Sequence, residues 1–143
     1  RTWTPRPVAG SAGLIASTWH PAHEQWGASQ IQNRFVKATH RGMLSKDMQA
    51  WTAVRIIGEA AQRTKSKDLK VITDYIKSPE FSLAAFKGQK VTFRNWNWQL
   101  RQPILLSDNR SVVSVSPQEG FLHQVSELDT LGVDQPETKC SLQ

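Results

Sequence analysis

The clearest structural pattern in the chain is one long amphipathic segment, Lys46-Asp-Met-Gln-Ala-Trp51-Thr-Ala-Val-Arg-Ile-Ile-Gly-Glu-Ala-Ala61-Gln-Arg-Thr64. Apolar residues recur in it at spacings of three and four, which is the period of an α-helix. They are Met48, Trp51, Val54, Ile57 and Ala61. Further alanines widen this surface, so the pattern predicts a helix over residues 46–64 that is packed on two sides. Ser45 is its predicted N-cap, and Asp47 in the first turn complements the helix dipole.

Two more helices are predicted on either side of this stretch. Over residues 21–41 an apolar arc lies beside a basic arc on the helical wheel, with Pro21 suited to the first turn and Gly42 to the C-cap. Over residues 67–77 the apolar positions again have helical spacing, Ser66 is the predicted cap, and a proline follows the end.

The remaining segments have the period of strands. Residues 8–16 are small and apolar and predict a buried strand. Alternation over residues 91–93 and again over 96–100 predicts a strand with a bulge near position 95, on which Trp96 and Trp98 share one face. We expect that face to cover the core or an interface, with stacking on a ligand as the alternative. Residues 103–106 and 111–115 predict a hairpin across a polar turn.

Length and composition limit the class of protein. The chain has 143 residues, of which 38% are apolar, and this is enough for one domain with its own core. No apolar run approaches the roughly 20 residues of a membrane-spanning helix, so no membrane span is expected. The single cysteine, Cys140, excludes an internal disulfide framework and a cysteine zinc cluster. Because the first residue is Arg1, we expect a chain that was cut from a longer precursor.

Positive charge is concentrated in one segment. Residues 34–70 contain nine basic and three acidic side chains, and this excess equals the net charge of +6 of the whole chain. Two solvated helix faces are the favoured interpretation, and the alternative is a basic adaptor module that binds an anionic partner through residues 34–70. Trp51 is the only tryptophan within this segment, so the aromatic interleaving of a nucleic-acid platform is lacking and no nucleic-acid partner is expected.

The motifs of catalysis and of metal or cofactor binding are lacking. The sequence contains no nucleophile elbow, no phosphate-binding glycine loop and no dinucleotide fingerprint. His20-Pro-Ala-His23-Glu24 is the nearest approach to a metal cluster, but it lacks the His-Glu-x-x-His order and a further ligand. We therefore expect a protein that is not an enzyme and that binds no metal and no cofactor.

A family resemblance rests on the order of several motifs along the chain. They are Ala12-Gly-Leu-Ile-Ala-Ser-Thr-Trp19, Asn33-Arg-Phe-Val-Lys37, Asp47 to Ala61 of the long helix, Phe86-Lys-Gly-Gln-Lys-Val-Thr-Phe93, Asn95-Trp-Asn-Trp-Gln-Leu-Arg-Gln-Pro-Ile104 and Pro117-Gln-Glu-Gly-Phe-Leu-His-Gln-Val-Ser-Glu-Leu-Asp-Thr-Leu-Gly132. In this order they resemble the C-terminal part of type I periplasmic solute-binding proteins, the branched-chain amino-acid-binding group of ABC transporters. The last two motifs resemble the branch associated with pyrroloquinoline-quinone-dependent alcohol catabolism.

The resemblance implies an α/β protein of two lobes joined by a hinge, with the ligand held between the lobes in the periplasm. Residues 1–117 would form part of the C-terminal lobe with hinge-crossing strands, and residues 118–143 a C-terminal tail. The implied function is that of the substrate-binding component of an ABC transporter, which binds a small polar solute in the cleft between the lobes. The implied partners are the solute, an ABC permease, and the remainder of the two-lobed protein or a second chain.

Four residues are candidates for ligand binding. Trp19 lies at a junction between strand and helix, and Trp51 lies near the start of a helix; such places face ligand crevices in α/β folds. The resemblance adds His20 at the same junction. It also adds the position at the start of the long apolar helix, which falls on Lys46 or Asp47, and the carboxylate of Asp47 would meet a ligand ammonium. The alternative role for Asp47 is a first-turn partner of the helix dipole.

Overall fold

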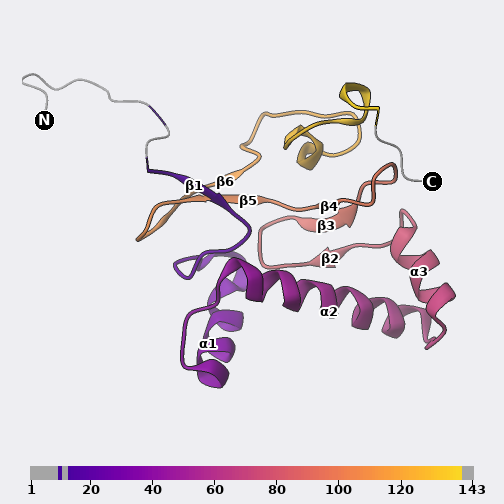
Figure 1. Ribbon diagram of the computed structural model, residues 1–143, viewed down its shortest axis with the longest axis horizontal. Coiled ribbons are helices and arrows are strands. Elements are labelled where there is room, and N and C mark those ends of the chain that lie inside the picture. Colours follow the sequence, from indigo (N-terminus) through magenta and orange to yellow (C-terminus); the bar gives the residue numbers. More distant parts are fainter. Residues whose placement is uncertain (1–9, 11–12, 140–143) are drawn as a thin grey trace, which may run out of the picture.

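Helices and strands follow one another in blocks along the chain, whose computed structural model describes Gly10 and residues 13–139. The expected mixture of helix and strand is confirmed. Figure 1 shows the strands on one side of the long helix α2, with α1 near one of its ends and α3 near the other. The helices are α1 (Ala28–Thr39), α2 (Ser45–Thr64) and α3 (Leu69–Lys77), with 3₁₀-helices η1 (Gln25–Gly27), η2 (Glu127–Thr130) and η3 (Gln135–Glu137).

The strands form two small antiparallel sheets. The first has the order β1-β5-β6, and the second has the order β2-β3-β4. The members are β1 (Ile15–Ser17), β5 (Ile104–Ser107) and β6 (Val112–Ser116), then β2 (Leu83–Ala84), β3 (Lys90–Phe93) and β4 (Leu100–Arg101). Every pairing between described strands is antiparallel, so these residues do not by themselves build a parallel sheet. The finer expectation, a type I periplasmic-binding-protein fold, stays a prediction.

The long helix forms where its period predicts it, but its start and its packing differ from the prediction. Ser45 is not the N-cap, because its hydroxyl donates to the Trp19 carbonyl at 2.9 Å and accepts from the Trp19 backbone N–H at 3.2 Å. The prediction of packing on two sides is also wrong. The buried residues of α2 fall on one face, while Val54 and Ile57 are 73% and 57% exposed.

Two other helix ends differ for local reasons. The predicted start of the first helix at Pro21 is wrong, since Trp26 (φ 51°) and Gly27 (φ 80°) are left-handed and α1 begins only after them. The C-cap of α1 is His40 in place of the predicted Gly42. The third helix is capped by Asp68, whose side chain accepts from a backbone N–H of the first turn, whereas the predicted cap Ser66 accepts from the Asp68 N–H.

The strand predictions are partly correct. The hairpin of β5 and β6 is confirmed, with a register irregularity between Leu106 and Ser107. The predicted buried strand over residues 8–16 is observed only from Ile15, which is exposed; positions 8, 9, 11 and 12 lie outside the described residues. Trp96 and Trp98 lie in the turn between β3 and β4, so they share no strand face and the predicted bulge near position 95 is wrong. Trp98 has a left-handed backbone (φ 57°).

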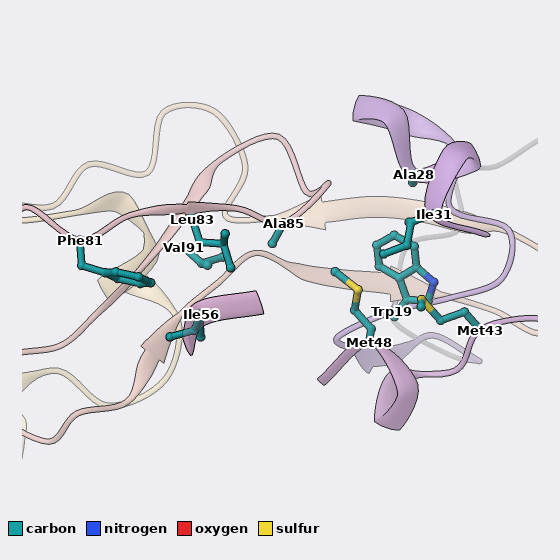
Figure 2. Close-up of a cluster of buried hydrophobic side chains, with 10 residues drawn as sticks. All are labelled: Trp19, Ala28, Ile31, Met43, Met48, Ile56, Phe81, Leu83, Ala85 and Val91. Carbon is teal, nitrogen blue, oxygen red and sulfur yellow. The ribbon is translucent and has the colours of Figure 1, made fainter. Parts of the chain in front are cut away.

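The hydrophobic core lies between the helices and the second sheet. Figure 2 shows Met48 of α2 close to Trp19 and Met43, and Ile56 on the side of Phe81 and Val91. Because these two residues lie eight apart on one helix face, α2 connects both halves of the core. In the part of the chain that the structure describes, no helix combines the length and apolar character needed to cross a membrane.

The C-terminal segment is held against the second sheet by ion pairs. Asp129 of η2 accepts from Arg94 Nε at 2.8 Å and from Arg101 Nε at 2.9 Å. Arg94 also donates to the carbonyls of Leu131 and Val133. The predicted boundary between residues 117 and 118 stays a prediction, but residues 129–133 are tied to the part of the chain that precedes it. Cys140 lies outside the described residues.

Candidate functional site

A hollow of about 680 Å³ opens where three connections of the fold meet. These are the segment that follows β1, the loop between α1 and α2, and the turn between β5 and β6. The pairing of Ile15 with Ser107 brings the first and third together although they lie 92 residues apart. A long-range strand pairing therefore creates this hollow.

The structure brings three of the four predicted ligand residues to this hollow. Trp19, His20 and Asp47 line it, and Ser17, Arg41 and Asp108 lie beside them. Trp51 does not line it. The Trp51 ring lies 5.6 Å from the ring of Phe86, and the side chain packs against the hydrophobic core.

The carboxylate of Asp47 is already engaged by protein groups. Arg41 donates to both carboxylate oxygens, at 2.6 Å and 2.7 Å, and the Leu44 backbone N–H donates at 2.9 Å. These hydrogen bonds, with that from Arg41 the largest cause, lower the pKa of Asp47 to about 2. Asp47 therefore closes the loop between α1 and α2 as an anion at neutral pH, and a ligand ammonium would share it with Arg41.

Two buried polar atoms beside the hollow have no hydrogen-bond partner among the described residues. They are the indole Nε1 of Trp19 and the hydroxyl Oγ of Ser17. Leaving such an atom without a partner costs about 1–3 kcal/mol. Both residues line the hollow. The indole N–H can only donate, so it requires an acceptor atom.

His20 has a defined tautomer. The backbone N–H of Ala22 donates to His20 Nδ1 at 3.1 Å, so the neutral ring carries its proton on Nε2.

Asp108, on the turn between β5 and β6, accepts from the backbone N–H groups of Arg110 and Ser111 at 2.7 Å each. These backbone hydrogen bonds lower the pKa of Asp108. The hollow is thus bordered by charges of both signs.

The lining residues that the sequence did not indicate as site residues include Ser17, Arg41 and Asp108. The turn at positions 107–110 was predicted as a turn, but no local signal indicates that it lies against β1. No three His, Cys, Asp or Glu side chains among the described residues are grouped so that they could hold a metal ion. Of the two histidines in the short motif, His23 instead donates from Nε2 to the Phe86 carbonyl at 2.9 Å.

Comparison with protein-family models, with curated proteins and with solved structures finds no match to this chain. The family named by the resemblance therefore stays a prediction.

Replacing Asp47 with asparagine should remove a pH-dependent part of the stability. The pKa of this carboxyl is about 2 in the folded protein and about 3.9 in an unfolded chain. Folding therefore gains from the pair above about pH 4, and the gain is lost as the pH falls through about 2. In urea unfolding between pH 2 and pH 6, the gap between wild type and Asp47→Asn should narrow below about pH 4. The difference in stability between wild type and Arg41→Gln should narrow over the same pH range. A difference that stays constant with pH for either variant would contradict the assignment of the ion pair.

Proposed function

We propose that this chain is the solute-binding part of a periplasmic ABC-transporter component, and that the hollow at β1, the α1–α2 loop and the β5–β6 turn holds a small polar solute. The observation that carries the proposal is the pair of buried, unpartnered polar atoms, Trp19 Nε1 and Ser17 Oγ, on residues that line this hollow. Native proteins leave few such atoms without a partner, and each calls for an explanation. A bound solute that supplies the missing hydrogen-bond partners would explain both atoms.

The chemistry of the lining groups restricts the solute. Trp19 Nε1 requires an acceptor such as a carbonyl, carboxylate or hydroxyl oxygen. Arg41 and Asp47 supply opposite charges within one ion pair, and His20 Nε2 supplies a further donor in its neutral form. A small molecule that has both donors and acceptors fits these groups, and no step of bond making or breaking is required of them.

Binding by a two-lobed protein would use these residues as one wall. The rest of the protein would supply the other wall, and the solute would favour the closed arrangement by contacting both. Delivery to a permease would then depend on closure. This part of the proposal rests on the family resemblance.

The alternative of a basic adaptor gains no support from the arrangement of charges. Four of the nine basic side chains in residues 34–70 are in ion pairs with carboxylates, namely Arg41, Arg55, Arg63 and Lys70. Arg55 and Arg63 both pair with Glu59, which neutralises part of the excess on α2. The favoured interpretation from the sequence, solvated helix faces, accounts for these contacts.

A thermal-shift screen of the purified chain tests the proposal. The probes are the proteinogenic amino acids, small hydroxy acids and polyols, each at 10 mM. We expect at least one probe to raise the Tm by roughly 5–10 °C, because saturation at about 100 times the Kd stabilises by about 2.7 kcal/mol.

Two matched variants locate the binding. Trp19→Phe keeps an aromatic ring but removes Nε1, and Ser17→Ala removes the hydroxyl; each should reduce the shift by at least half. Trp98→Phe, a change of the same type in the turn between β3 and β4, should leave the shift unchanged. If no probe stabilises the wild type, or if Trp19→Phe and Ser17→Ala respond like wild type, the proposal is wrong.

A further inference from the structure

A second hollow, of about 780 Å³, contains a buried lysine that has no carboxylate partner. Lys87 follows β2 and is only 2% exposed. Its amine donates to Gln102 Oε1 at 2.7 Å and to the Pro103 carbonyl at the long distance of 3.4 Å. No carboxylate among the described residues lies within ion-pair distance of it. Lysine has three N–H donors, so two neutral acceptors leave this ammonium incompletely compensated.

Lys87 remains positively charged at neutral pH, and the neighbouring groups do not neutralise this charge. Burial lowers the pKa of the Lys87 amine to about 8, which still leaves it mostly protonated at pH 7. His23, also buried beside the hollow, has its pKa lowered by burial, and its Nε2 donates to the Phe86 carbonyl. The lowered pKa favours the neutral histidine ring at pH 7, and the buried positive charge of Lys87 has no carboxylate of a described residue within ion-pair distance.

An aromatic surface is held at the same hollow by a strained backbone. Trp26 has φ 51° and ψ 35°, a left-handed conformation that costs a tryptophan about 1–2 kcal/mol. Its ring lies directly on Gly88, where an added Cβ would come within 2.7 Å of the indole, and the side chain remains 52% exposed. Because Gly88 has no side chain, the Trp26 indole packs on the backbone next to Lys87, and part of the indole remains exposed at the hollow.

Two carboxylates at the hollow restrict the charge of a ligand. Glu24 and Glu119 are exposed residues that line it, and neither is within ion-pair distance of Lys87. They would repel an anion of high charge more than a monoanion. An acid with a single charge is therefore favoured.

We propose that this hollow binds a small aromatic monocarboxylate, with the ligand carboxylate accepting from the Lys87 amine and the ligand ring lying against Trp26. The site shares no lining residue with the hollow of the proposed function and does not rest on it. The carboxylate supplies the missing counter-charge, and the ring covers the exposed indole face.

Isothermal titration calorimetry of the purified chain at pH 7 tests this, with benzoate as the probe. The wild type should bind benzoate at least tenfold more tightly than benzamide, which has the same shape without the charge. It should bind inorganic phosphate more weakly than benzoate. Absence of benzoate binding up to 10 mM, or equal binding of benzoate and benzamide, would overturn the proposal. Phosphate binding as tight as that of benzoate would also overturn it. These comparisons use the wild type and depend on no variant.

Variants assign the contacts. Lys87→Met keeps the length of the side chain and should weaken benzoate binding at least tenfold, whereas Lys90→Met, an exposed lysine on β3, should not. Trp26→Asn removes the ring with a residue that tolerates the left-handed backbone, and it should weaken benzoate binding several-fold. Benzoate binding that is unchanged in Lys87→Met would sink the assignment. Ser17→Ala should leave benzoate binding intact, which separates this site from the first hollow.

Discussion

Replacing Asp129 with alanine is expected to lower the free energy of unfolding by about 3–5 kcal/mol, because it leaves the buried guanidinium group of Arg94 and the partly buried one of Arg101 without their common anion. Asp129 is 3% exposed and accepts from Arg94 and Arg101 at 2.8–2.9 Å. Arg94 is itself buried, so water cannot replace the carboxylate without local opening. The change should release η2 from the second sheet.

Urea unfolding followed by circular dichroism measures this effect. Asp129→Asn keeps the shape and one carbonyl acceptor, and it should retain part of the stability that alanine loses. The matched control is Asp74→Ala, which removes an exposed carboxylate paired with Lys70 and should change the stability by at most about 0.5 kcal/mol. A loss below about 1 kcal/mol for Asp129→Ala would show that the buried pairs do not hold the segment.

The second large effect is expected for Phe81→Ala, which should cost about 3–5 kcal/mol through lost burial and the cavity left behind. Phe81 is 1% exposed. Its ring lies 6.0 Å from the ring of Tyr75 on α3 and 5.8 Å from that of Phe93 on β3. The ring therefore packs between α3 and β3, and its removal leaves a cavity between these two elements.

Equilibrium unfolding again provides the measurement, and the near-UV circular dichroism spectrum reports the loss of aromatic packing. Phe121→Ala is the matched control, since Phe121 is 59% exposed in the C-terminal segment and its removal should change the stability by less than about 0.5 kcal/mol. If the two substitutions lower the free energy of unfolding equally, Phe81 does not contribute to the core as the structure indicates.

Local patterns predicted the elements that depend on local forces. The helix over residues 46–64 and the hairpin of β5 and β6 formed as expected, because each has a clear apolar period and a turn or charge signal at its ends. The predictions failed where a side chain has a distant partner. Ser45 has the chemistry of an N-cap, yet it bonds to the backbone of Trp19, 26 residues away. Trp96 and Trp98 alternate like strand residues, yet they lie in a turn.

In the candidate sites, too, local sequence indicated some residues and distant contacts determined the others. The sequence pointed to Trp19, His20 and Asp47 by their places at element junctions, and the structure brings these three to one hollow. It could not indicate that Arg41 would bind both oxygens of Asp47, because that pair depends on the path of the loop between α1 and α2. The burial of Lys87 could not be predicted from the neighbouring residues. A lysine is normally an exposed charge, and this one is buried only because distant segments pack around it.

The helical period of α2, the hairpin and the mixture of helix and strand follow from the spacing of apolar residues and from turn chemistry within a few positions of the chain. Which described polar atoms are buried without partners, and where the hollows lie, depends on the folded chain as a whole. Burial and pairing arise from contacts between distant segments, such as β1 with β5 or Lys87 with Gln102, and the spacing of residues along the chain does not encode those contacts.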